Sequence, residues 1–367
     1  MDTLNFLQHY WWAVVSLLGA LLVFLLFVQG GQTLIFSTAS SKAQRDLLIG
    51  ALGHKWEITF TTLVTFGGAA FASFPLFYST SFGGAYWLWM LILFLFVLQA
   101  VSYEFRNKAC NLLGEKTYDV FLFMNGAFGT ILLGIAVGTL FTGGAYYMDK
   151  LNITDIQSNV ISRWANGWMG LDAVCVPQNI LLGIVVFLAA RTLGLLFVMS
   201  ELKDVSVEGA RLSDKCAIKV KVTGTAFVAA FVLFLVSLFL STGYEAVGAE
   251  IVPVKYKYFL NFIELGWPLA ILLAGVILVL AGLLRNSFYV TGGGVVLAVW
   301  ALLICAAFNN TAYFPSTVCL NDSLTLYNSS SSLFTLKVMA YVSIAVPFVL
   351  GYIIVVWRKM SGKHTEY

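Results

Sequence analysis

Long hydrophobic runs alternate with short polar segments along most of this chain. Nine of these runs are long enough, at roughly 20 residues, to cross a bilayer as α-helices. They occupy residues 11–28, 59–77, 86–103, 120–141, 180–199, 222–240, 259–284, 288–308 and 338–357. The pattern predicts an all-α, polytopic membrane protein in which residues 1–367 form a single integral membrane domain.

The distribution of lysine and arginine predicts the orientation of these spans. An outside N-terminus makes residues 29–58, 104–119, 200–221, 285–287 and 358–367 cytoplasmic, and these segments hold 15 of the 21 basic residues. Five basic residues are then outside and Arg191 lies within a span. Cytoplasmic loops of membrane proteins carry such an excess, so we expect the C-terminus to be cytoplasmic and the number of spans to be odd.

The composition agrees with a membrane protein and excludes other classes. Hydrophobic residues make up 60% of the chain and charged residues only 11%, whereas soluble domains carry about 25% charged residues. The net charge of +3 does not indicate a nucleic-acid partner. The first ten residues lack the basic segment of a cleavable signal, so we interpret residues 11–28 as a span that is retained.

Three polar segments carry local signals. Ser41 followed by Gln44 resembles a capping box and Gly53 suits a helix end, which predicts an amphipathic helix along the inner interface. Trp164 and Trp168 are four residues apart, so we expect them to share one face of a short helix at headgroup level. Residues 309–337 read as an extended external cover rather than a domain.

The hairpin from His54 to Lys108 holds the first candidate site. Its two open ends fold to one membrane face, which brings Glu57, just before one apolar run, near Glu104, just after the next. A buried carboxyl has a raised pKa and a nearby cation lowers it, so Lys55, Arg106 and Lys108 could tune these acids for proton uptake. The alternative is that both acids are ordinary solvated residues at span ends.

Arg191, within the 180–199 run, needs a counter-charge if it lies in the hydrocarbon. Glu264 is one candidate, and an anionic group on a partner subunit is the other. A structural ion pair is the simpler of the interpretations. The three consecutive glycines at 292–294 lie inside a run and predict close helix packing.

Sites for metals and haem are poorly supported by this sequence. The three histidines, His9, His54 and His364, lie outside the runs, so no span offers an imidazole ligand to a b-type haem. The cysteines show no paired spacing, although Cys175 and Cys319 both fall in outer segments and could form a disulfide. We expect no catalytic, cofactor-binding or metal-binding residue in this chain.

Several stretches resemble subunit II of the cytochrome bd-type quinol oxidases, and together they run nearly end to end. They are WW at 11–12, WEITFTTLVTFGGAAFASFPLFY at 56–78, AVSYEFRNK at 100–108, MNGAFGTILLGIAVGTLF at 124–141, ARTLGLLF at 190–197 and YFPSTVCLNDSLTLYNSSSSLFTLKVM at 313–339.

The resemblance implies nine spans, arranged as two four-helix bundles plus one helix, in a bacterial cytoplasmic (inner) membrane. It implies a heterodimer with subunit I, which holds haem b and haem d, and small accessory subunits or a bound quinone or lipid are compatible with it. The complex would oxidise quinol and reduce dioxygen to water. The family associates proton delivery toward subunit I with residues that match Glu57, Glu104 and Lys108.

Two departures from the family weaken part of this expectation. Many members carry an acidic DGFD motif after the first span, where this chain has GGQT at Gly30–Thr33. Many also have histidine before the Trp-acid pair, where this chain has Lys55, with His54 one place earlier. We therefore rank Glu104 above Glu57. A purely structural subunit and a secondary transporter are the alternative functions.

Overall fold

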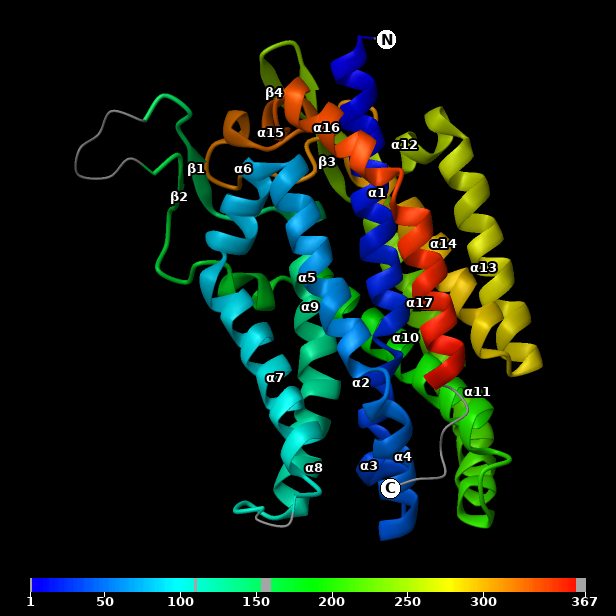
Figure 1. Ribbon diagram of the computed structural model, residues 1–367. Helices are drawn as coiled ribbons and strands as arrows, with labels where there is room; N and C mark the ends of the chain where they lie inside the picture. The colour runs from blue at the N-terminus through cyan, green and yellow to red at the C-terminus, as the bar shows by residue number, and fades with distance from the viewer. Residues whose placement is uncertain (1, 109–110, 153–159, 361–367) are drawn as a thin grey trace.

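The computed structural model describes residues 2–108, 111–152 and 160–360, and most of them lie in helices that run in roughly one direction (Figure 1). Two small antiparallel sheets lie at one end of the molecule, together with the start of the first helix. The basic segments that contain α4, α8 and the start of α11 lie at the opposite end.

The longer helices are α1 (Thr3–Leu25), α4 (Lys42–Gly53), α5 (Trp56–Ser73), α7 (Tyr86–Phe105), α8 (Glu115–Met124), α9 (Thr130–Thr142), α10 (Pro177–Leu202), α11 (Val207–Leu240), α13 (Trp267–Arg285), α14 (Phe288–Ala307), α16 (Leu333–Ser343) and α17 (Val346–Met360). The short ones are α2 (Phe27–Gln32), α3 (Leu34–Ser37), α6 (Pro75–Tyr78), α12 (Lys257–Leu265), α15 (Leu326–Ser329), the π-helical turns η1 (Ser79–Gly83) and η2 (Asn125–Gly129), and the 3₁₀ turns η3 (Leu171–Cys175) and η4 (Leu320–Asp322).

Seven helical stretches in the described residues are long and apolar enough to cross a membrane. They coincide with seven of the nine predicted runs, which confirms a helical, multi-pass membrane protein. The other two predicted runs, 59–77 and 338–357, correspond to α5 and to the pair α16–α17, which run beside the other helices (Figure 1). The count of nine spans, and the division into two bundles plus one helix, stay predictions. The seven stretches are Thr3–Gln32, Tyr86–Phe105, Glu115–Thr142, Pro177–Leu202, Val207–Leu240, Trp267–Arg285 and Phe288–Ala307.

Three predicted runs are broken helices, which hydropathy alone does not reveal. The run 59–77 breaks at Phe74, because the residue before Pro75 is driven out of the helical region. The run 259–284 breaks at Gly266, which has a positive φ of 66° between α12 and α13. The run 338–357 starts earlier, at Leu333, where the Ser332 hydroxyl caps the helix, and it is interrupted between α16 and α17.

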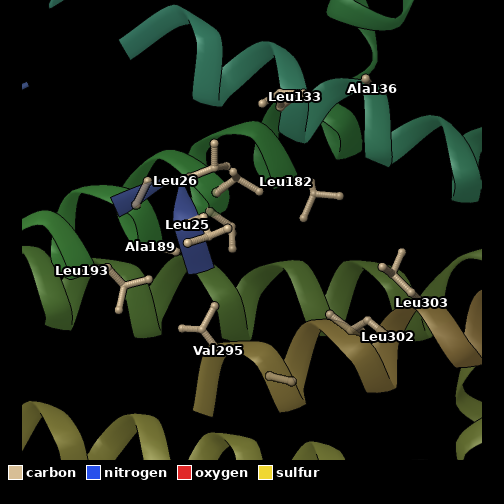
Figure 2. Packing of buried hydrophobic residues seen from close by; sticks show 14 of the residues in the cluster. Leu25, Leu26, Leu133, Ala136, Leu182, Ala189, Leu193, Val295, Leu302 and Leu303 are labelled. Carbon is tan, nitrogen blue, oxygen red and sulfur yellow. The ribbon is translucent and has the colours of Figure 1, made fainter. Parts of the chain in front are cut away.

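Helix α10 lies at the centre of the bundle and packs on α2, α9, α11 and α14. Figure 2 shows its side chains Leu182, Ala189 and Leu193 together with residues of α9, of the α1–α2 junction and of α14. The neighbouring helices contribute, for example, Leu133, Ala136, Leu25, Leu26, Val295, Leu302 and Leu303.

Glycines allow the backbones of these helices to approach closely. A Cβ at Gly30 would collide with the backbone carbonyl of Ala190, and one at Gly134 would lie 2.6 Å from the Cα of Gly183. Small residues serve this purpose in membranes, because lipid tails already solvate apolar side chains and association depends on close packing.

Indole groups tie α1 to the helices that follow it much later in the chain. Trp12 donates from its ring nitrogen to the carbonyl of Leu303 at 2.8 Å, and Trp11 donates to that of Leu336 at 3.1 Å. Trp300 donates in return to the carbonyl of Ala13 at 2.9 Å. Because these bonds lie between apolar helices, each satisfies a polar group that the bilayer could not.

The polar segments at the sheet-bearing end fold over the helix ends as a cover. Strands β1 (Tyr146–Met148) and β2 (Ser162–Trp164) form one hairpin, and β3 (Thr242–Val247) and β4 (Glu250–Lys255) form another. Single β-bridges join the segment after α14 to both hairpins, at Ser316 and at Thr311. The expected cover over residues 309–337 is therefore present, although the sequence analysis missed both hairpins.

The predicted helix that would carry Trp164 and Trp168 on one face is wrong. Trp164 ends strand β2 and donates to the carbonyl of Thr80 at 3.0 Å, while Trp168 lies in a turn and is exposed. The prediction for α4 is confirmed in part. Ser41 accepts from the amide of Gln44, but the Gln44 side chain accepts from Ser40 instead of completing the capping box.

The glycine run at 292–294 offers a matched test of helix packing. A Cβ at Gly294 would lie 2.5 Å from the amide nitrogen of Val279 and 2.6 Å from the carbonyl oxygen of Gly275, whereas a Cβ at Gly293 meets open space. We expect Gly294→Ala to destabilise the protein by about 1–3 kcal/mol through overpacking, and Gly293→Ala to leave it unchanged or slightly stabilised. Thermal unfolding in detergent measures both, and equal midpoints would contradict this packing.

Candidate proton-uptake site

The two ends of the α5–α7 hairpin meet at the basic end of the molecule. The rings of Trp56 and Tyr103 stack with centroids 5.8 Å apart and planes 12° from parallel. Glu57 and Glu104 follow these aromatic residues directly in the sequence. The hairpin thus brings the segments that carry both candidate acids together at one end.

Both candidate acids are exposed on the surface of this chain. Glu104 pairs with Lys108 one helical turn later, at 3.1 Å, and both side chains are more than half exposed. Glu57, in the first turn of α5, makes no ion pair or hydrogen bond with another described residue. An exposed pair of this kind contributes at most about 1 kcal/mol to stability, so neither acid is needed to hold the fold together.

Arg106 does not face Glu104, contrary to the sequence-based expectation that it helps tune that acid. Its side chain is almost fully buried and binds Asp119 at 2.7 Å and Asp46 at 2.8 Å. Burial alone would lower the pKa of Arg106, but the hydrogen bonds and charges of the two aspartates outweigh it and raise that pKa. The three residues fasten α4, α7 and α8 to one another.

Lys55 is also buried, although it stands only two residues before Glu57. Its ammonium group donates to the carbonyl of Trp357 at 3.2 Å and lies 4.3 Å from the centre of the indole ring. Burial lowers the pKa of Lys55, and the charge of Glu201 offsets part of that change. Lys55 thus links the start of α5 to α17, and its cation–π contact adds to the hydrogen bond.

A cluster of buried amides lies deeper in the bundle, beside Tyr103. The Gln99 carbonyl oxygen accepts from Gln29 at 2.8 Å, from Gln32 at 2.7 Å and from Asn125, and Gln32 also donates to the Tyr103 hydroxyl at 3.1 Å. All four amide side chains are fully buried. One polar atom of Gln29, of Gln99 and of Asn125 has no partner among the described residues, which is the arrangement that a buried water molecule satisfies.

This amide cluster was missed by the sequence analysis. The only local signals were Gln99 and Asn125 inside two apolar runs and two glutamines just after the run 11–28, and Asn125 opens the π-helical turn η2. Turns of this type occur often at functional sites. The cluster joins α2, α7 and η2, so it also brings residues near the GGQT stretch to the hairpin.

Arg191 does not pair with Glu264, so that prediction is wrong. Its guanidinium donates to the carbonyl of Thr33 at 3.1 Å, to the Thr33 hydroxyl at 2.6 Å and to the Ser37 hydroxyl at 2.9 Å. Glu264 accepts instead from Asn309. Arg191 lies in the middle of α10, whereas Glu264 is at the end of α12, next to the break at Gly266 and near the hairpin cover.

Comparison with known proteins decides the family. The sequence profile of cytochrome bd terminal oxidase subunit II matches residues 7–360. The chain belongs to this family. It is 26% identical over 322 residues to cytochrome bd ubiquinol oxidase subunit 2 of Bacillus subtilis (strain 168), covering 85% of this chain and 82% of that relative.

Further comparisons agree with this assignment. The chain is 24% identical over 375 residues to cytochrome bd-I ubiquinol oxidase subunit 2 of Escherichia coli (strain K12), covering 98% of this chain and 96% of the relative. Its fold is similar to a chain of the bd oxidase from Geobacillus thermodenitrificans, with a TM-score of 0.63 at 14% identity, over 96% of this chain and 98% of that one. The resemblance stated from the sequence is therefore confirmed.

Membership of the family makes this chain part of a quinol oxidase complex, with subunit I as its partner and with haem in that partner. In the described residues, no group of three or more His, Cys, Asp or Glu side chains could hold a metal ion. His9 bonds the carbonyl of Asn5 and packs on Phe308, and His364 lies outside the described residues.

The cysteines of this bd oxidase subunit are free thiols wherever the structure describes them. Cys175 is exposed and Cys319 is half-buried, and the two are not joined in a disulfide. Cys216 and Cys305 are buried within α11 and α14. The disulfide considered from the sequence is thus absent, and the outer cover is held by hydrogen bonds instead, such as that from Tyr146 to the carbonyl of Phe314 at 2.5 Å.

A cavity of about 310 Å³ opens between α10, α11, α13 and α14 of the subunit. All of its lining side chains are apolar, among them Phe141, Phe227, Phe231, Leu272 and Val299. Such a cavity suits a hydrocarbon chain, because nothing in its lining can hydrogen-bond a polar head.

The amide cluster yields a prediction about assembly. Replacing Gln99 by leucine removes the acceptor that three buried amide groups share, at about 1–3 kcal/mol for each donor left unpaired. We expect Gln99→Leu to lower the yield of assembled, haem-containing oxidase and its thermal midpoint. Gln99→Glu keeps a carbonyl acceptor if its buried carboxyl group is protonated and uncharged, so it should assemble better than Gln99→Leu. A Gln99→Leu enzyme with the yield and midpoint of the wild type would contradict the role of the cluster.

Proposed function

We propose that this chain is the haem-free subunit of a bd-type oxidase that stabilises subunit I and lines a proton-uptake route at the cytoplasmic rim. Glu104 and Lys108 are the first residues of that route and Glu57 is secondary. The complex oxidises quinol and reduces dioxygen to water, with haem b and haem d in subunit I. The protons that this reduction consumes would enter the complex from the bacterial cytoplasm. The complex itself would reside in the inner membrane.

The observation that carries this proposal is the exposure of the two acids at the mouth of one hairpin. Neither carboxylate is enclosed by this chain, so a proton route past them needs a second protein surface to close it off from lipid and solvent. Subunit I is the partner that the family provides. A carboxylate can accept and release a proton, so the two acids at such an interface could relay protons between the cytoplasm and subunit I. Lys108 pairs with Glu104 and holds that carboxylate in place.

The polar groups behind the hairpin support a hydrated extension of this route. Tyr103 precedes Glu104 and contacts Gln32, which in turn contacts Gln99 and Asn125. Amides do not titrate near neutral pH, so any proton moving past them would travel on water held by the unpartnered atoms of the cluster. The charge changes themselves would take place at Glu104 and Glu57.

The apolar cavity supports a second, passive task. It could take the tail of a quinone or of a lipid, and its lack of polar lining assigns no quinone chemistry to this chain. Small accessory subunits are compatible with the exposed apolar faces of the outer helices, for example at Trp87, Phe94 and Val97 of α7.

Substitution of Glu104 tests the proton role. We expect Glu104→Gln in the assembled oxidase to slow oxygen consumption by about tenfold, because a glutamine cannot relay a proton, while the haem absorption spectrum stays normal. Glu57→Gln should have a smaller effect. Glu250→Gln, an exposed acid in the hairpin at the other end, is the matched control and should retain full turnover.

Two results would reject this assignment in favour of other functions. Unchanged turnover in Glu104→Gln with normal spectra would exclude a proton role, and the ordinary surface pairing of Glu104 with Lys108 would then favour a purely structural subunit. Loss of the haem spectrum in every acid variant would also favour that reading. Solute transport by this chain alone in liposomes would support the transporter, for which the broken helices are the only structural argument.

A further inference from the structure

A group of cations gathers where α3 ends, and the acids of the chain do not balance it. Arg191 of α10 donates to Thr33 and to the Ser37 hydroxyl, as described above. Lys219 of α11 donates to the carbonyl of the same Ser37 and to the Thr38 hydroxyl at 3.1 Å. Two positive charges from different helices therefore lie within hydrogen-bonding distance of one serine.

Lys215, one turn before Lys219, extends the group. It donates to the Ser40 hydroxyl and to the Gln44 side chain at 3.0 Å. Among the described residues, no carboxylate lies within 4.0 Å of Arg191, Lys215 or Lys219, since every ion pair found involves other residues. The nearest acid in this network is Glu208, which the Gln44 amide contacts at 2.9 Å and which pairs with Arg211.

Capping of a helix end explains only part of this charge. Helices α1, α2 and α3 follow one another through single turn residues, so their last free carbonyls lie at Thr33–Ser37. The C-terminus of a helix carries roughly half a negative elementary charge, which attracts cations. Two full charges at that end leave an excess that calls for an anion.

The position of the group along α11 indicates what that anion is. The half of α11 after Lys221 is a continuous apolar run, residues 222–240, of roughly 28 Å at 1.5 Å per residue, close to the thickness of the hydrocarbon layer. Lys219 and Lys215 precede this run, and Arg191 contacts the same serine as Lys219. Lys215 and Lys219 thus lie at the level of the lipid headgroups, and the long side chain of Arg191, which starts in the middle of α10, reaches the same serine as Lys219.

Exposed apolar side chains flank the cations. Ile218 and Val222 of α11 are each 72% exposed, and Phe36 of α3 is 46% exposed while its ring packs on Phe123. Arg191 and Lys219 themselves are half-buried, so part of each residue is open to its surroundings. Charged donors beside exposed apolar surface match a phosphate that carries hydrocarbon chains. A free phosphate ion would contact only the charged donors and would leave the apolar side chains uncovered.

We propose that Arg191 and Lys219, with Lys215 at the edge, bind the phosphate group of an anionic phospholipid at the headgroup level of the basic membrane face. The planar guanidinium presents paired donors to phosphate oxygens, and the lysines add point charges. This site shares no residue with the proposed proton route, because it involves α3, α10 and α11 rather than the α5–α7 hairpin, although Thr33 directly follows Gln32 of the amide cluster.

The test compares retention of phosphatidylglycerol by purified oxidase complexes. Native mass spectrometry after detergent washing would measure bound lipid in the wild type, in an Arg191→Gln/Lys219→Met double variant and in Thr33→Asp. Thr33→Asp places a carboxylate beside Arg191 and so supplies the counter-charge from within the chain. We expect both variants to bind phosphatidylglycerol about tenfold more weakly, whereas Lys221→Met, on the exposed neighbouring position, should bind like the wild type.

Each outcome decides the proposal. Equal retention in the wild type and in Thr33→Asp would overturn it, and would mean that the cations only cap α3. Displacement of the lipid by millimolar inorganic phosphate, with equal thermal stabilisation by phosphate alone, would overturn the lipid assignment in favour of a free ion. Equal affinity for phosphatidylcholine and phosphatidylglycerol would overturn the charge argument. If the double variant does not assemble, Thr33→Asp alone carries the test, since it removes no existing cation.

Discussion

Close approach of helix backbones is the constraint on which the rest of this structure depends. In lipid there is little hydrophobic gain when one apolar helix meets another, so association requires tight packing and internal hydrogen bonds. Helix α10 achieves this on two sides, because Gly30 and Gly194 let α2 approach it and Gly134 and Gly183 do the same with α9. The amide cluster and the cation group both lie beside α2 and α3, so their geometry depends on this packing.

Polar groups follow a clear division between the inside and the rim of the bundle. Inside, uncharged amides bind one another around Gln99, where a charge would be costly to desolvate. At the rim, Arg106 is buried but has two aspartates as partners, so its charge is compensated within the chain. Glu57 and Glu104, by contrast, are left at the surface of this chain, as the proposed route beside subunit I requires.

Hydropathy predicted most of the helices because a span must be long and apolar, and the resemblance predicted the family. Hydropathy did not predict the breaks at Phe74 and Gly266, because a hydropathy profile contains no information about backbone torsions. Nor could it predict the partners of Arg106 and Arg191. Asp119 is 13 residues from Arg106 across a loop, and Thr33 is 158 residues from Arg191, so only the packing of helices brings them together.

The bonds between α1 and the last helices bear on how the protein is made. Gln8 donates to Ser330 and Trp11 to Leu336, and Tyr10 bonds Ser343, across more than 320 positions of sequence. Lys55 likewise reaches the backbone of Trp357. A ribosome releases the N-terminal helices into the membrane well before these partners exist. Until the last helices are inserted, the indole and amide groups of α1 therefore have no partners in the bilayer. An insertase or another chaperone that shields these groups during synthesis would reduce misassembly of the subunit.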